Sequence, residues 1–142
     1  DNYDALNSHF LPALIKKVHD LKLNNKKELI LWGNGLAKRE VIYVDDIADA
    51  CIFFMKKNFF GTILNIGTGK DFSIKQYAKI ILNKIIPKNK IKIRYDLSKP
   101  NGTPRKVLDI KLANKYGWKP KTKLDEAITK TYKNFLENNK IA

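Results

Sequence analysis

Apolar residues recur at helical spacing near the start of the chain, and they predict an α-helix from about Ser8 to Leu21. Ser8 suits the N-cap, and Pro12 is tolerated there because it lies in or beside the first turn, where a backbone donor is not needed. The face expected to be buried contains Phe10, Leu11, Leu14, Ile15, Val18 and Leu21.

Three more stretches predict helices by the same spacing. Asp45 or Asp46 can cap a helix whose expected buried face is Ile47, Cys51, Phe54 and Met55. Ser73 and Gln76 form a capping box that opens a helix with apolar residues on one side: Ile74, Tyr77, Ala78, Ile81 and Ile85. A last helix would use Leu124, Ala127, Ile128, Tyr132, Phe135 and Leu136.

The segments between these helices predict short strands. "ELILW" ends in a turn at Gly33 and Gly35, while "REVIYV" and "GTILNI" are apolar and rich in β-branched residues. Polar and apolar residues alternate from about Lys90 to Tyr95, which indicates a half-buried strand. Asp109 can cap a short helix that ends at Gly117. The sequence has no internal repeat, so we expect one α/β domain over residues 1–142, with many helices and few strands.

Composition restricts the function classes. Charged residues make up 30% of the 142-residue chain and its net charge is +14, which would suit a nucleic-acid partner. However, the basic residues are spread along the chain, and only Arg39, Arg94 and Arg105 are arginines, so we expect no specific nucleic-acid partner. With one cysteine and no apolar run long enough for a membrane span, we expect a cytoplasmic protein without disulfides or a metal site.

Three stretches could hold a phosphorylated ligand. "GTGKDF", residues 67–72, has the first two glycines of a dinucleotide-binding loop but lacks the third, so the pattern favours an ordinary turn. "WGNGLAKRE" places Trp32 near Arg39, which suits either a sugar-phosphate site or a core tryptophan beside a surface arginine. "SKPNGTPRK" carries Lys99, Arg105 and Lys106 in a loop stiffened by prolines.

Taken in order, four segments resemble the C-terminal portion of the GDP-L-fucose synthase family, within the extended short-chain dehydrogenase/reductases. They are "NSHFLPALIKKVHDLKLNN", "LWGNGLAKREVIYVDDIADA", "LNIGTGKDFSIKQYA" and "SKPNGTPRKVLDI…GWKPKTKLDEAI". The resemblance covers almost the whole chain. It implies the substrate-binding portion of a Rossmann-type reductase that uses NADP(H), acts on a GDP-sugar and forms a homodimer through the part not present here.

The resemblance also implies residue roles. His9 would lie near the nicotinamide and serve as acid/base in epimerisation, and a histidine has a suitable pKa for this task. Lys17, Trp32 and Arg39 would bind the nucleotide sugar. The loop that contains Arg105 would contribute further contacts, but Asn101 stands where the family has an aspartate. An amide carries no charge, so another nucleotide-sugar 4-reductase or epimerase remains an alternative.

Two features of such a reductase are not found in the sequence. The first is a Gly-rich loop for the cofactor pyrophosphate. The second is a Tyr-x-x-x-Lys pair on one face of a helix. Only Tyr95 and Lys99 have this spacing, and they run from a strand end into a loop. We therefore expect a substrate-binding part without its dinucleotide-binding domain, and no reductase activity from the 142 residues alone.

Overall fold

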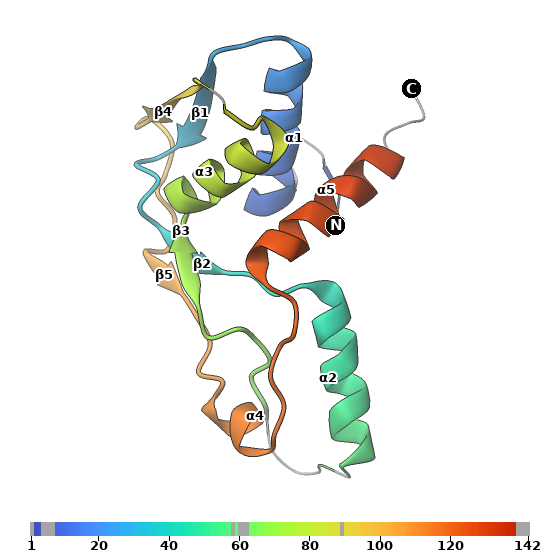
Figure 1. Ribbon diagram of the computed structural model, residues 1–142. Helices are drawn as coiled ribbons and strands as arrows, with labels where there is room; N and C mark the ends of the chain where they lie inside the picture. Colours follow the sequence, from blue (N-terminus) through green and yellow to red (C-terminus); the bar gives the residue numbers. More distant parts are fainter. Residues whose placement is uncertain (1, 4–7, 58, 60–62, 89, 139–142) are drawn as a thin grey trace. The chain divides into compact units, whose positions relative to one another are not determined.

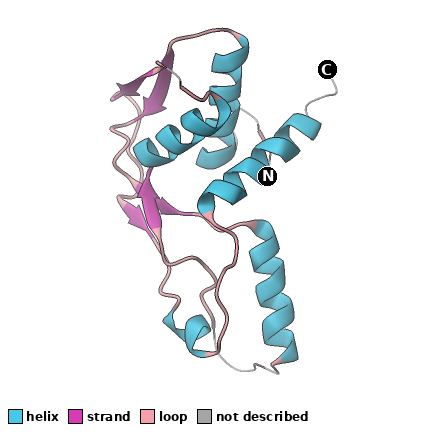
Figure 2. Ribbon diagram, in the orientation of Figure 1, coloured by secondary structure: helices cyan, strands magenta, loops and turns pink. Residues whose placement is uncertain are grey.

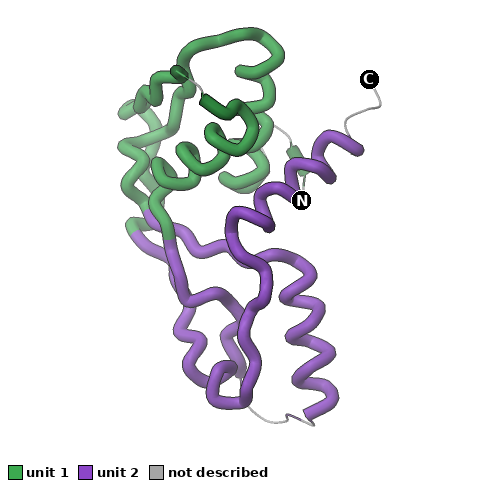
Figure 3. The backbone as a smooth tube through the Cα atoms, viewed as in Figure 1, with its two compact units in different colours: residues 1–37, 72–104 green, residues 38–71, 105–142 purple. Residues whose placement is uncertain are grey.

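The computed structural model describes residues 2–3, 8–57, 59, 63–88 and 90–138 (Figure 1). The chain divides into two compact units, one formed by residues 1–37 and 72–104 and the other by residues 38–71 and 105–142 (Figure 3). Each unit therefore combines two distant segments of the sequence. The assignment of one domain to the whole chain stays a prediction.

The first unit is built on a pair of parallel strands covered by two helices (Figure 2). Strand β1 (Glu28–Trp32) pairs with β4 (Lys92–Asp96), with Glu28 opposite Lys92 and Trp32 opposite Asp96. Helices α1 (Phe10–Leu23) and α3 (Ile74–Ile85) pack against each other beside this pair. The parallel order requires a long crossover between the strands, and α3 lies within that connection.

Strand β1 is buried on one face only. Leu29 and Leu31 are buried, whereas Glu28, Ile30 and Trp32 are exposed, as the two-residue period of a strand requires. The helices contribute the remaining buried apolar residues of this unit, which are Leu14, Ile15, Val18, Leu21, Tyr77, Ala78, Ile81, Leu82 and Ile85. Most of the predicted faces of α1 and α3 are thus confirmed, and Trp32 is left outside the core.

The helix starts were predicted with mixed success. The capping box of α3 is present, because Ser73 Oγ accepts from the Gln76 N–H at 3.2 Å and Gln76 Oε1 accepts from the Ser73 N–H at 2.8 Å. The predicted Ser8 cap of α1 is wrong. His9 occupies the N-cap position, without a side-chain capping bond, and Ser8 Oγ is buried with no hydrogen-bond partner.

The second unit contains strand β2 (Lys38–Glu40), helix α2 (Val44–Lys56), strand β5 (Arg105–Lys106), helix α4 (Lys111–Lys115) and helix α5 (Leu124–Asn138). Strands β2 and β5 are parallel, and β3 (Asp71–Ser73) completes a three-stranded sheet in the order β3-β2-β5. The boundary between the units falls within β3, whose Asp71 belongs to the second unit.

Two strand predictions differ from the structure. The run "REVIYV" keeps only its first residues as β2, because α2 begins at Val44 with Asp45 and Asp46 in its first turn, where acidic groups stabilise a helix start. Residues 63–66 of "GTILNI" form no strand, and residues 61–62 lie outside the described part of the chain. The short strand β3 was not predicted at all.

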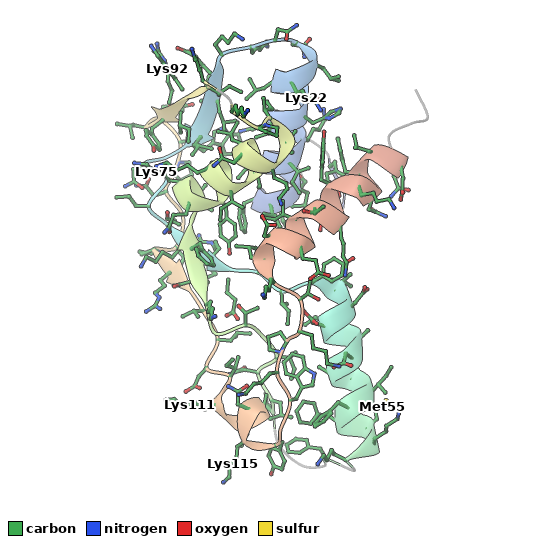
Figure 4. The ribbon with its side chains drawn as sticks, in the orientation of Figure 1. Lys22, Met55, Lys75, Lys92, Lys111 and Lys115 are labelled. Atoms are coloured by element: carbon green, nitrogen blue, oxygen red, sulfur yellow. The ribbon has the colours of Figure 1, made fainter. Side chains whose placement is uncertain are left out.

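The predicted buried face of α2 is wrong for Cys51 and Met55, whereas Ile47 and Phe54 are half-buried. Asp46 and Ala50 are the buried residues, whereas Cys51 is exposed and Met55 is 76% exposed, with its side chain directed away from the helix (Figure 4). The Asp46 carboxylate accepts the backbone N–H groups of Lys121 and Thr122, each at 3.1 Å, and these bonds satisfy the buried side chain.

The α/β class is confirmed, since the described residues form five helices and five short strands. Trp118 and Ala113 join Ala50 in the core of the second unit. No helix within the described residues is long and apolar enough to cross a membrane. The same residues contain no group of three or more histidine, cysteine, aspartate or glutamate side chains placed to hold a metal ion.

Candidate functional site

An exposed indole with two lysines is the central feature of the first unit. Trp32 ends β1 and is 51% exposed. The Lys17 ammonium, from α1, lies 5.2 Å from the centroid of its ring, and the Lys99 ammonium, from the turn after β4, lies 5.6 Å from it. Both distances are within the range of cation–π attraction. The interpretation of Trp32 as a core tryptophan is wrong, and the core tryptophan is Trp118, 2% exposed.

Lys17 is half-buried, unlike most lysines of this chain. Its burial lowers the pKa of the ammonium group, because removal from water disfavours the charged form. A bound anion would offset this cost. The position is therefore electrostatically suited to a phosphate or carboxylate ligand.

The turn that follows Trp32 is held to the loop after β4 by two hydrogen bonds. The Gly33 N–H donates to the Asp96 carbonyl at 2.9 Å, and the Asn34 N–H donates to Asn101 Oδ1 at 2.7 Å. Gly33 has φ +65°, and a Cβ at this position would lie 2.5 Å from Asn101 Oδ1. Both the conformation and the close approach require glycine here. Asn101 thus connects the two loops, and a carboxylate oxygen could accept the same bond.

His9 lies at the start of α1, eight residues before Lys17, and its side chain is exposed. Its carbonyl accepts the Ala13 N–H at 3.1 Å, so the backbone at this position is part of the helix. An exposed imidazole on a fixed helix terminus can exchange protons with a ligand. The assignment of a catalytic role to His9 stays a prediction.

The second unit holds Arg39 and Arg105 on the paired strands β2 and β5. The register places Lys38 opposite Arg105 and Arg39 opposite Lys106, so the two arginines are diagonal neighbours. Arg39 is half-buried, and its Nη1 donates to the Lys38 carbonyl at 2.7 Å. Two adjacent strands thus present four basic residues in a small area of this unit.

The sequence analysis missed Asp71, the partner of Arg105. Arg105 Nε donates to Asp71 Oδ2, and Arg105 Nη2 lies 3.5 Å from Asp71 Oδ1. The bond from Arg105 lowers the pKa of the Asp71 carboxyl and raises the pKa of the guanidinium. The Asp71 side chain is only 10% exposed, whereas Arg105 is 62% exposed, so the remaining guanidinium donors face solvent. The signal available in the sequence was a lone acid after "GTGK".

The "GTG" turn is occupied by a side chain of the protein itself. Glu40 Oε1 accepts the backbone N–H groups of Thr68 and of Gly69, the latter at 2.7 Å, and Glu40 Oε2 accepts the Leu108 N–H at 2.7 Å. Gly67 has no room for a Cβ because Glu40 Oε1 lies against it. A carboxylate thus fills the position that a phosphate would take, which supports the turn interpretation over a phosphate loop.

Two shallow pockets, of about 540 and 460 Å³, adjoin β4 in the first unit. They share Ile93 and Tyr95, and neither is lined by a residue predicted to bind substrate. Of the predicted site residues, the first unit brings Lys17 and Trp32 together and places Asn101 beside the turn that follows Trp32. It also contains His9, while Arg39 and Arg105 lie in the second unit.

Residues 2–67 match the NAD dependent epimerase/dehydratase family. Over these residues the chain is similar to this family, and its α/β fold is shared with Rossmann-type reductases of known structure. GDP-L-fucose synthase 1 of Arabidopsis thaliana is 38% identical over 138 residues, which are 97% of this chain and 42% of that protein. GDP-L-colitose synthase of Yersinia pseudotuberculosis is 39% identical over 138 residues, which are 96% of this chain and 44% of that protein.

The crystal structure of a GDP-6-OMe-4-keto-L-xylo-heptose reductase from C. jejuni superposes with a TM-score of 0.82 at 29% identity. The match covers 97% of this chain and 50% of that one. The chain therefore spans less than half the length of the curated relatives described above, and half the length of this solved structure.

Proposed function

We propose that the chain is the substrate-binding part of a nucleotide-sugar epimerase/reductase, and that this enzyme is a GDP-L-fucose synthase. It would convert GDP-4-keto-6-deoxy-D-mannose to GDP-L-fucose by epimerisation at C3 and C5 and reduction at C4. The observation that carries the proposal is the similarity to GDP-L-fucose synthases over 97% of the chain. The exposed Trp32 with Lys17 over its ring supports it, because a sugar nucleotide needs both an aromatic face and a cation.

NADPH would supply the hydride for C4. The "GTG" turn, filled by Glu40, does not fit the cofactor pyrophosphate, so this group would be held outside the described residues. His9 fits a position beside the nicotinamide, since it is exposed at a helix start. The whole enzyme would form a homodimer through the part that precedes this chain.

The site residues would have distinct tasks. His9 would exchange protons at C3 and C5, whose acidity comes from the adjacent ketone. Lys17, Trp32 and Arg39 would bind the nucleotide sugar, and Arg105 would contribute the donors that Asp71 leaves to solvent. Asn101 would also contact the substrate. It belongs to the loop that its side chain holds against the turn after Trp32.

A second candidate is another nucleotide-sugar reductase or epimerase of the same family. GDP-L-colitose synthase is as similar to this chain as the fucose synthases are, and Asn101 departs from the family's aspartate. GDP-L-fucose synthase and GDP-L-colitose synthase differ in the sugar and not in the nucleotide, so the sugar product distinguishes these two.

The proposed function is tested with the longer enzyme that contains this chain. With NADPH and GDP-4-keto-6-deoxy-D-mannose, we expect GDP-L-fucose as the product, identified by NMR of the purified nucleotide sugar. A product inverted at fewer centres, or turnover of a different 4-keto sugar alone, would favour the second candidate. Absence of turnover with every GDP-4-keto sugar would contradict the proposal.

Arg39→Lys in this enzyme is expected to raise KM for the nucleotide sugar about ten-fold with a smaller change in kcat. Lysine keeps the charge but loses the planar fork that can donate two parallel hydrogen bonds to a phosphate. Steady-state kinetics measure the effect. Arg94→Lys is the control, because the exposed Arg94 lies in the middle of β4 and pairs with Glu28 of β1 at 2.9 Å. Equal KM values for both variants would contradict the role of Arg39 in binding the nucleotide sugar.

A further inference from the structure

We propose that Lys99 is a second cation of the substrate site and that Lys17 and Lys99 together bind the diphosphate of the nucleotide sugar beside Trp32. The inference rests on the proposed function and deepens it. It gives a specific role to Lys99, to which the family resemblance assigned none, and it names the chemical group that this residue recognises.

The first observation is the meeting of two positive charges at one exposed ring. Lys17 and Lys99 come from segments more than 80 residues apart, yet their ammonium groups lie 5.2 and 5.6 Å from the centroid of Trp32. Within the described residues neither ammonium forms a salt bridge, whereas five other lysines do: Lys16, Lys111, Lys121, Lys130 and Lys133. Two ammonium groups beside one exposed ring make this part of the surface positive, which favours an anionic ligand there.

The second observation is that Lys99 stands on a fixed loop. The Lys99 N–H donates to the Asp96 carbonyl at 3.2 Å, and Asp96 Oδ1 accepts the Ser98 N–H at 3.1 Å. Asn101 closes the same loop onto the turn after Trp32. The backbone at Lys99 is therefore ordered before a ligand binds, so less conformational entropy is lost on binding.

The chemistry of the cluster selects the ligand group. Ammonium groups are compact point charges that suit the tetrahedral oxygens of a phosphate, and two of them match the charge of a diphosphate. The half-exposed ring of Trp32 adds an apolar surface for the neighbouring sugar or base. A nucleoside without phosphates would use only that surface. The ligand class that fits best is a nucleoside diphosphate.

The test compares GDP with guanosine on the longer enzyme that contains this chain. Isothermal titration calorimetry gives Kd for both ligands. Lys99→Met keeps most of the length of the side chain but removes its charge. We expect this variant to bind GDP about ten-fold more weakly, the loss typical of one charged hydrogen bond, with the Kd for guanosine unchanged.

Lys92→Met is the matched control. Lys92 belongs to the same unit and begins the strand that ends at Asp96, and its side chain points outward at the far end of this strand (Figure 4). The control loses the same charge, and we expect it to bind GDP like the unmodified protein. Equal weakening of GDP binding in both variants would indicate a general electrostatic effect and would overturn the inference.

The outcomes separate the two proposals. If the unmodified enzyme binds GDP and Lys99→Met binds it equally well, the role of Lys99 is overturned while the nucleotide-sugar site stands. If the unmodified enzyme binds neither GDP nor guanosine, the substrate site itself is contradicted, and the role of Lys99 with it. A Lys99→Met variant that loses GDP and guanosine to the same extent would show that the residue supports the ring and not the diphosphate.

Discussion

Replacing His9 with asparagine in the longer enzyme is expected to slow proton exchange at C3 and C5 of the substrate by roughly 10²–10⁴, the range typical for loss of a general acid/base. Asparagine keeps a polar side chain at the N-cap of α1 and removes the titratable group. Because α1 keeps its cap position, the lysine further along the helix is undisturbed. Affinity for the nucleotide sugar should therefore change much less than the exchange rate.

The measurement is deuterium incorporation from solvent, followed by NMR or mass spectrometry of the nucleotide sugar. His19→Asn is the control, because His19 is the only other histidine of the chain and lies on the same helix. Its burial lowers the pKa of the imidazole, so it is less suited to accept a proton near neutrality. Wild-type exchange in His9→Asn would place the base elsewhere. Loss of deuterium exchange in His19→Asn alone would assign the acid/base role to His19.

The periodic elements were the part of the fold that the sequence predicted well. Helices α1 and α3 carry apolar residues at regular helical spacing over three or more turns, and their own residues decide which face is buried. The buried face of helix α2 was predicted only in part. Its buried Asp46 was not predicted, because the Asp46 carboxylate binds the backbone of residues 121–122, more than 70 residues away. A contact between distant segments cannot be found by reading periodicity in one of them.

The candidate site likewise has one feature that follows from local sequence and others that depend on contacts between distant segments. The exposure of Trp32 follows from the alternation along β1, and a reading of the two-residue period could have found it. The position of Lys99 over this ring could not be found in that way. It depends on the parallel pairing of β1 with β4, which brings the loop after β4 beside the end of β1. Asp71 was missed for the same reason, since its partner Arg105 lies on another strand.

Glu40→Ala is expected to destabilise the chain by about 2–4 kcal/mol. The Glu40 carboxylate accepts three backbone N–H groups and the Thr68 hydroxyl, the latter at 3.1 Å, and hydrogen bonds to a charged group contribute about 1.5–3 kcal/mol each. Water can replace part of this bonding because the turn is partly exposed. For a chain of this size, the expected loss lowers the Tm by roughly 5–15 °C.

Urea unfolding followed by the fluorescence of Trp118 measures this loss, since Trp118 is buried in the same unit as Glu40. Glu137→Ala is the control, because Glu137 is exposed on α5 and lies 3.8 Å from the Lys133 ammonium, a surface pair of little energetic value. Equal stability of Glu40→Ala and the control would contradict the role of Glu40.

Removal of the carboxylate also leaves the N–H groups of Thr68, Gly69 and Leu108 facing a common empty position. Such a group of backbone donors binds anions. Millimolar inorganic phosphate should therefore recover part of the stability of Glu40→Ala, measured as a rise in Tm. In the unmodified chain the Glu40 carboxylate occupies this turn, so phosphate should not bind there. Phosphate that stabilises the unmodified chain through the turn, seen as shifts of the Thr68 and Gly69 amide signals in NMR, would show that Glu40 yields this position to a ligand.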